Sequence, residues 1–178
     1  MAKTVWNVDA VHSEVGFTVK HMMISKAKGT FDKFDAVIEA DVEDLTDSKV
    51  EVTIDAASIN TRNKDRDDHL RSADFFDVEN HPNITFVATD ISKESASQYK
   101  VTGDLTVKGT TKPVTVDVEY VGQSKDPMSG NIVAGFNGET KINRKEFGLT
   151  WNAAVETGGV LVGDEVKIHF EIEAHKAE

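Results

Sequence analysis

The chain contains no cysteine, and its basic side chains are outnumbered by acidic ones. Without cysteine it can form no disulfide, no thiol nucleophile and no thiolate metal site, although this absence leaves the redox compartment open. The sequence has 20 Lys and Arg residues against 31 Asp and Glu residues, a net charge of −11. Because phosphate groups are bound by clustered Lys and Arg, this balance argues against a general affinity for nucleic acid or for an anionic membrane.

Long hydrophobic runs are also absent. No stretch approaches the length of a membrane span, and the start, Met1 to Ala10, lacks an apolar core followed by a small-residue cleavage site. We therefore expect no integral membrane segment and a cytoplasmic location, which holds unless a leader has been removed. At 178 residues and 39% hydrophobic composition, the chain is long enough for a substantial core, and we expect one domain over residues 1–178.

Sequence signatures of common enzymes are missing as well. There is no GxSxG elbow, P-loop, HExxH or GxGxxG motif. Asp9, His12 and Ser13 lie close together in the sequence, which superficially suggests a catalytic triad. His12 and Ser13 are neighbours on an extended chain, however, so their side chains point to opposite faces. We expect no catalytic residue.

Metal ligands and cofactor motifs are equally hard to find. No two of the six histidines have a spacing that would bring two imidazoles together as metal ligands. Asp65, Asp67 and Asp68 resemble half of a calcium loop but lack its glycine turn and distal glutamate, so the face of a helix is the better interpretation. We expect no metal and no cofactor.

What the chain does contain is a regular alternation of apolar and polar side chains, typical of half-buried strands. The apolar positions fall into about eight runs, separated by turn sequences such as Lys108–Gly109 and Asp126–Pro127. These positions are Val15, Phe17 and Val19; Phe34, Ala36, Ile38, Ala40 and Val42; Val50, Val52, Ile54 and Ala56; Ile84, Phe86 and Ala88; Tyr99, Val101, Gly103, Leu105 and Val107; Val114, Val116, Val118 and Tyr120; Ile132, Ala134, Phe136, Gly138, Thr140 and Ile142; and Val166, Ile168, Phe170, Ile172 and Ala174.

So many one-sided strands must close into a barrel or pair as a sandwich. Runs of about ten residues span roughly 33 Å at ~3.3 Å per residue, which is longer than ordinary sandwich strands. We therefore predict an all-β fold, an elongated antiparallel eight-stranded β-barrel. Such a barrel is either filled by side chains or holds one small ligand. The small residues at inward positions, such as Ala134 and Gly138, could leave room or could accommodate neighbouring aromatic rings in a packed core.

The stretch from Ser58 to Phe86 differs from the rest because it is charge-dense and helical in character. We predict one short polar helix over Arg62 to Ser72, covering the barrel. Phe75 and Phe76 follow it and need a hydrophobic socket, and Pro82 disfavours further helix. The i,i+4 pairs expected on the helix are Asp65–His69 and Asp67–Arg71.

The segment from Ile142 to Asn152 is the last informative one. Phe147, Leu149 and Trp151 share one face and need burial, whereas the preceding Asn143 to Glu146 are polar. This pattern indicates a strand corner with an aromatic plug.

Together these segments resemble the YceI-like family of polyisoprenoid-binding, lipocalin-like bacterial proteins, and the resemblance covers nearly the whole chain. It is carried by Trp6, Asp9, His12–Ser13, Phe17, Val19 and His21; by Gly29–Thr30–Phe31; by residues 67–86, DDHLRSADFFDVENHPNITF; by residues 101–114, VTGDLTVKGTTKPV; by residues 142–152, INRKEFGLTWN; and by residues 163–174, GDEVKIHFEIEA.

The resemblance implies a hydrophobic tunnel that takes a long-chain isoprenoid or another fatty-chain amphiphile, with no catalytic step. The residues that it places at or beside the tunnel are Phe17, Val19, Phe31, Phe75, Phe76, Phe86, Phe136, Phe147, Leu149 and Trp151. For a polar mouth that meets the head group, the candidates are His21, Arg66, His69 and Arg71, although the helix charges could instead serve ion pairs with neighbouring aspartates.

Two other functions stay open at this point. An enzyme acting on a bound lipid would need a base inside the barrel, for which His21 is the one inward candidate, or a convergence of His12, His21 and Arg144 at one barrel end. A stress-related interaction protein with a packed barrel would need no ligand. The sequence leaves the oligomer open, and a homodimer is among the assemblies compatible with it.

Overall fold

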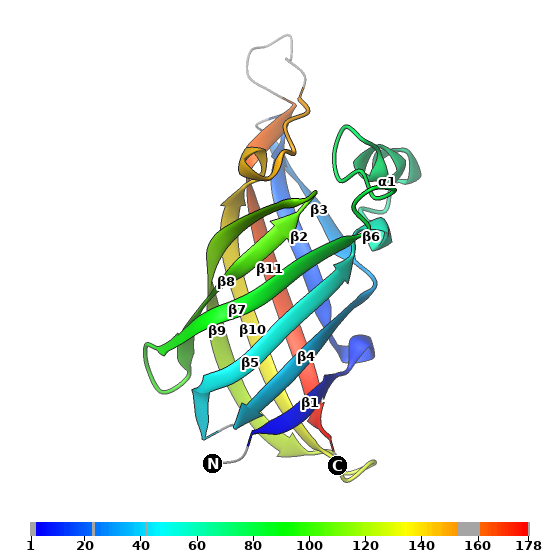
Figure 1. The fold of residues 1–178 in the computed structure, drawn as a ribbon. Helices are drawn as coiled ribbons and strands as arrows, with labels where there is room; N and C mark the ends of the chain where they lie inside the picture. Colours follow the sequence, from blue (N-terminus) through cyan, green and yellow to red (C-terminus); the bar gives the residue numbers. More distant parts are fainter. Residues whose placement is uncertain (1–2, 23, 42, 153–160, 178) are drawn as a thin grey trace.

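The computed structural model describes residues 3–22, 24–41, 43–152 and 161–177, which form one closed antiparallel sheet with a single α-helix and three short 3-10 helices (Figure 1). Val42, one of the predicted inward positions, lies outside these ranges. The elements in chain order are β1 (Thr4–Val8), η1 (Ala10–His12), β2 (Glu14–His21), β3 (Ser25–Phe31), β4 (Phe34–Asp41), β5 (Asp44–Asp55), η2 (Ala56–Ser58), β6 (Ile59–Asn60), α1 (Lys64–Arg71), β7 (Asn83–Lys93), β8 (Gln98–Val107), β9 (Thr110–Lys125), β10 (Ile132–Asn143), η3 (Arg144–Phe147) and β11 (Val162–Lys176).

The sheet closes into a barrel because β1 pairs with both β4 and β11. The closed ring runs β1-β4-β5-β7-β8-β9-β10-β11 and back to β1, which makes eight strands, all paired antiparallel. The predicted eight-stranded barrel with one short helix is therefore confirmed.

Three short strands, β1, β3 and β6, were not predicted, because they share barrel positions with longer strands. β1 and β2 both pair with β11, one after the other, and η1 interrupts them. On the side away from β11, β2 pairs with β3 and β1 pairs with β4. β6 adds only the Thr30–Asn60 and Phe31–Ile59 pairs to β3.

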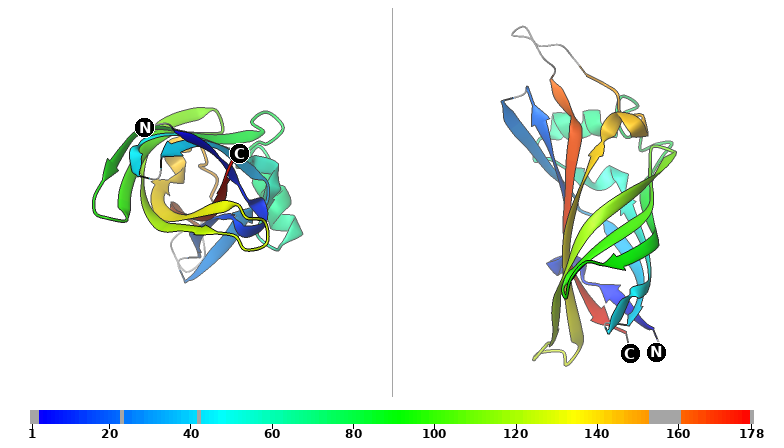
Figure 2. Two further views of the ribbon diagram at one scale, coloured as in Figure 1. Left: turned by 90° about the horizontal axis from the view of Figure 1, so that it is seen from below. Right: turned by 90° about the vertical axis from the view of Figure 1, so that its left-hand side faces the viewer.

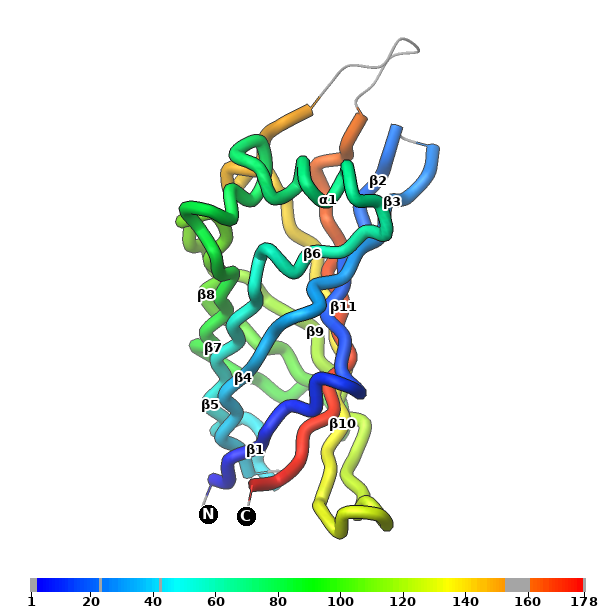
Figure 3. The backbone as a smooth tube through the Cα atoms, turned by 90° about the vertical axis from the view of Figure 1, so that its right-hand side faces the viewer, coloured from blue at the N-terminus to red at the C-terminus, as the bar shows by residue number. Residues whose placement is uncertain are grey.

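The two ends of the barrel are built differently, as Figures 2 and 3 show. One end, here called the far end, carries both termini and the turns after β4, β7 and β9. The other, the α1 end, carries α1, η3 and the β2–β3 hairpin. At the far end Trp6, 4% exposed, donates its indole N–H to the carbonyl of Ala40 at 3.3 Å. A buried cluster surrounds it, consisting of Ala40, Leu45, Tyr99, Ala134 and Ala174.

The inward glycines do not add free space. A Cβ at Gly138 would lie 2.5 Å from the Phe170 ring and 2.6 Å from the carbonyl of Asp117. A Cβ at Gly103 would likewise lie 2.6 Å from the Phe86 ring. These glycines accommodate neighbouring rings, which was the second of the two interpretations of the small residues. Ala134, fully buried in the far-end cluster, leaves no room either.

Helix α1 is shorter than predicted, and its side chains pair differently. Asn63 caps it by accepting a hydrogen bond from the Arg66 backbone N–H at 3.0 Å. Asp67 is buried and accepts from the backbone N–H of Thr61 at 2.9 Å, so it does not pair with Arg71. The ion pairs observed are Lys64–Asp68 at 2.7 Å, Arg71–Asp68 at 3.1 Å and His69–Asp74 at 2.9 Å, in place of the two predicted pairs. No helix in the described part of the chain is long and apolar enough to cross a membrane.

Candidate functional site

The barrel contains a cavity of about 330 Å³ whose accessible surface is apolar, although Tyr99, Thr140 and Arg144 are among the residues that line it. It reaches from Leu45 and Tyr99 near the far end to Val19, Leu149 and Val162 at the α1 end. Inward aliphatic side chains in its middle stay only half-buried, among them Val52, Val116 and Val166. An inward side chain that keeps accessible surface faces empty space, because interiors packed with side chains leave few voids larger than a water molecule.

Eight of the ten residues predicted at or beside the tunnel line this cavity. They are Phe17, Val19, Phe31, Phe75, Phe76, Phe86, Phe136 and Leu149. Phe147 is 1% exposed and packs in the core cluster that includes Phe31 and Leu149, and it does not line the cavity. Trp151 is half-buried and also lies off the cavity wall. Whether any of the ten contacts a ligand stays a prediction.

Aromatic rings close the α1 end. The Trp151 ring lies 5.4 Å from the Phe75 ring and 4.6 Å from the His69 imidazole, and His69 and Phe75 lie 5.1 Å apart. Edge-on and tilted contacts at these distances are favourable for aromatic pairs. Phe76 packs edge-on against Phe31 at 5.9 Å. The two phenylalanines after α1 thus occupy the hydrophobic socket that the sequence required, and both line the cavity.

Arg144 holds the same end together from within. Its side chain is part of the cavity wall, yet the residue is only 3% exposed. The guanidinium donates to the carbonyls of Gly163 at 2.8 Å and Trp151 at 2.9 Å, and further to those of Leu149 and Val162. Burial lowers the pKa of Arg144 below its ordinary value, and the charge of Asp164 opposes this shift. Of the predicted polar corner, Asn143, Lys145 and Glu146 are exposed, whereas Arg144 is a buried clamp between η3 and the start of β11.

None of the four predicted mouth residues lines the cavity. Arg66 donates to the Thr61 side chain and backbone at 2.8 and 2.9 Å, and Arg71 donates to the carbonyl of Ala57 at 2.9 Å. His69 belongs to the ring cluster described above. His21 is paired across the sheet with Val162, a residue of the cavity wall.

A polar cluster of Asp9, His12 and Glu173 lies away from the cavity, at the break between β1 and β2. His12 Nδ1 is 2.7 Å from an Asp9 carboxylate oxygen and 3.9 Å from Glu173, and the three side chains lie within 4.8 Å of one another. The Asp9 hydrogen bond and charge raise the pKa of His12, and the same hydrogen bond lowers the pKa of Asp9. The Ser13 hydroxyl donates to the Glu173 carbonyl at 3.3 Å, so it contacts β11 and not His12. The arrangement lacks the serine–histidine contact of a triad.

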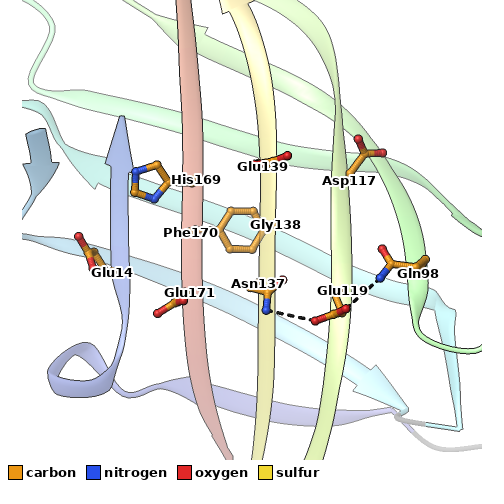
Figure 4. A pocket seen from close by; sticks show the side chains of 10 residues that line it. All are labelled: Glu14, Gln98, Asp117, Glu119, Asn137, Gly138, Glu139, His169, Phe170 and Glu171. Atoms are coloured by element: carbon orange, nitrogen blue, oxygen red, sulfur yellow. Dashed lines mark hydrogen bonds between the residues drawn. The ribbon is translucent and has the colours of Figure 1, made fainter. Parts of the chain in front are cut away.

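The outer wall of the barrel carries an open, polar groove of about 440 Å³ (Figure 4). Carboxylates from β2, β9, β10 and β11 line it, together with His169, whose outward position the alternation predicted. Glu119 accepts from Gln98 at 3.0 Å and Asn137 at 3.3 Å. Solvated carboxylates on strand surfaces serve solubility, so the apolar cavity is the better candidate site. The lining carboxylates are Glu14, Asp117, Glu119, Glu139 and Glu171.

The comparisons with known proteins agree with this architecture. The YceI-like domain model matches residues 6–174. UPF0312 proteins of Staphylococcus epidermidis and Staphylococcus aureus are 46% and 45% identical over 170 residues, covering 96% of this chain and 96% of each relative.

Solved structures give the same result. BcnA of Burkholderia cenocepacia is 31% identical with a TM-score of 0.82, covering 93% of this chain and 98% of that one. The YCEI protein of Campylobacter jejuni is 34% identical with a TM-score of 0.77, covering 89% and 90%. A polyisoprenoid binding domain from Saccharophagus degradans, at 15% identity, shares the fold with a TM-score of 0.70 over 98% and 99% of the two chains. Because the YceI-like domain model matches nearly the whole chain, this chain belongs to the YceI-like family.

Proposed function

We propose that this protein binds a long-chain isoprenoid or another fatty-chain amphiphile, with the chain inside the barrel and no catalytic step. The observation that carries the proposal is the enclosed apolar cavity with half-exposed aliphatic side chains. Apolar cavities stay dry and accept apolar ligands, and pockets for small molecules start at about 300 Å³. The fold is shared with a domain described as polyisoprenoid binding.

The size of the cavity sets what it can hold. A cavity of ~150 Å³ takes one benzene ring, so 330 Å³ accommodates roughly a dozen carbon atoms without rearrangement. Burial at ~0.8 kcal/mol per CH₂ then gives about 10 kcal/mol before ordering costs are deducted. A longer tail requires side chains to move, most readily the rings at the α1 end. Affinity comes from the tail, and length and branching determine selectivity.

The head group stays outside the apolar wall in this proposal. No polar atom inside compensates for burying it, because the Arg144 guanidinium is committed to backbone carbonyls. We place the head group at the α1 end, where His21 lies next to Val162. Arg66, His69 and Arg71 serve local contacts first: Arg71 pairs with Asp68, as the alternative interpretation held, whereas His69 pairs with Asp74 and Arg66 donates to Thr61.

Lipid extraction tests the proposal directly. Organic extract of the purified protein, analysed by mass spectrometry, is expected to contain a stoichiometric apolar compound. Val52→Trp should fill the cavity and abolish this loading, whereas Thr53→Trp, on the adjacent outward position, should not. An extract without lipid, together with failure of the delipidated protein to bind isoprenoid alcohols or fatty acids, would overturn the proposal and favour the interaction protein.

The remaining expectations stay predictions with their own measurements. Turnover of an isoprenoid ester by the purified protein would support the enzyme alternative, for which the apolar wall offers no general base. Metal analysis after dialysis tests the expected absence of a metal. Cell fractionation tests the cytoplasmic location, and light scattering tests the homodimer.

A further inference from the structure

The β2–β3 hairpin carries an exposed apolar tip at the same end as α1. Ile24 is 84% exposed and Met22 is 40% exposed. Met22 also adopts a left-handed backbone conformation, with φ 54°. Glycine and asparagine are favoured in this conformation, whereas a long apolar side chain can form no local hydrogen bond that would stabilise it. An exposed apolar pair at a strained turn indicates a role for these side chains outside the fold.

Lysines surround this tip on the outer face of the hairpin. Lys20 lies directly opposite Lys26, and Lys28 lies opposite Thr18. All three are exposed, and none forms an ion pair with a described residue. Like charges directly opposite each other on paired strands are destabilising, so this pair costs the free protein stability. In a chain of net charge −11, the uncompensated lysines make this hairpin an exception.

The position of the hairpin connects it to the cavity. Val19, one residue before Lys20, lines the cavity, as does Val162, which is paired with His21. The Met22 backbone N–H donates to the Leu161 carbonyl at 2.8 Å. The hairpin stands at the α1 end beside the start of β11 (Figures 2 and 3), and β3 has no second partner strand before Thr30 in the described part of the chain. Its tip is therefore free to contact a surface.

We propose that the β2–β3 hairpin docks the protein on an anionic lipid bilayer, with Met22 and Ile24 inserted at the interface and Lys20, Lys26 and Lys28 on the head groups. Each lysine near an anionic membrane strengthens binding about fivefold, and apolar side chains at the tip add to this. The docking surface lies at the end of the cavity through which a lipid tail would pass. The functional role of docking therefore rests on the proposed lipid-binding function.

The exposed lysines have another explanation, which does not account for the apolar side chains of Met22 and Ile24. Lysine on a free strand edge prevents edge-to-edge aggregation, and β3 has such an edge. Glutamate would serve that purpose equally well, whereas it would weaken binding to an anionic surface. Charge reversal therefore separates the two explanations.

The test is co-sedimentation of the delipidated protein with vesicles of phosphatidylcholine alone or of phosphatidylcholine mixed with anionic phosphatidylglycerol. We expect binding only to the mixed vesicles, decreasing with added salt. The Lys20→Glu, Lys26→Glu, Lys28→Glu triple variant should lose binding by at least about a hundredfold, since three lysines at about fivefold each are removed. Ile24→Glu should weaken it by about tenfold or more.

The matched control is Met128→Glu, because Met128 is 95% exposed in the turn after β9 at the opposite end. That variant should bind like the unmodified protein. Failure of the unmodified protein to bind the mixed vesicles, unchanged binding of Ile24→Glu, or equal losses in Met128→Glu and Ile24→Glu would each overturn the docking proposal. None of these results would affect lipid found by extraction, so failure of docking is distinguishable from failure of lipid binding.

Discussion

The far end and the α1 end of the barrel are both closed, but by different kinds of contact. At the far end the closing side chains, Trp6 and its cluster, belong to strands of the closed ring or their turns. At the α1 end they come from inserted segments, namely α1, the residues after it and the segment that follows η3. Strand residues cannot leave without opening the sheet, whereas inserted segments can move while the sheet stays paired. The comparison therefore predicts that a ligand enters and leaves through the α1 end, while the far end stays closed.

The largest effect on the comparison is expected from Arg144→Leu. The variant leaves four carbonyls without their donor, and at about 1–3 kcal/mol for each unsatisfied buried group we expect a loss of about 5 kcal/mol in the free energy of unfolding. Urea denaturation measures this, with the exposed Lys145→Leu as the control. A loss below 1 kcal/mol would mean that the α1 end does not depend on this clamp.

Trp6→Ala tests the far end. Truncation of a buried aromatic residue costs ~3–5 kcal/mol, and the hydrogen bond to Ala40 is lost with it. Because Trp6 does not line the cavity, we expect the folded fraction to retain its lipid. Equal lipid loss in this variant and in Phe75→Ala would break the distinction between the two ends. Denaturation and lipid extraction on the same preparation give both readouts.

Phe75→Ala sharpens the comparison at the α1 end. We expect a stability loss of about 3 kcal/mol and, in addition, faster release of bound lipid, because Phe75 is both buried and part of the cavity wall. Phe147→Ala is the matched control, a buried phenylalanine at the same end that does not line the cavity. Similar stability losses with faster release only in Phe75→Ala are expected. Equal release rates would show that ring burial alone governs retention.

The smallest effect concerns Asp9 and His12, which join β1 to β2. The pKa of His12 is raised above its ordinary 6.5, so its contribution to stability is complete below pH 6.5 and is lost as the pH rises through the raised value. The lowered pKa of Asp9 preserves the interaction above 3.8. His12→Gln should flatten the pH dependence of the unfolding midpoint above pH 6.5. An unchanged pH profile would exclude His12 as its source.

The barrel was predictable from the sequence because one-sided strands impose a period of two. The strands that escaped prediction have too few apolar inward positions: β3 offers only Ala27, Gly29 and Phe31. Ile91, which lines the cavity, was missed because the register shift between Ala88 and Asp90 changes the parity along β7. The alternation continues after the shift with the opposite phase, and Ile91 followed by polar Ser92 was the available signal.

The polar side of the site was less predictable. The burial of Arg144 was not predicted, because the sequence showed only a polar corner and arginine is rarely buried. Its partners are carbonyls of four different residues on two segments, and no local pattern encodes such a set. The helix pairs failed for a similar reason, since Asp67 is drawn inward by Thr61, a contact that depends on the path of the chain before α1. Alternation identifies which residues face inward, but not which polar groups meet.

The free edge of β3 also determines the order in which this protein unfolds locally. Between Ser25 and Gly29 the strand is paired with β2 alone, whereas β8 is paired with both β7 and β9 over most of its length. Separation of the hairpin therefore breaks one ladder, and removal of β8 breaks two. In hydrogen exchange, the amides of β3 should exchange long before those of β8, and the protein should lose its β2–β3 hairpin reversibly while the rest of the barrel stays protected.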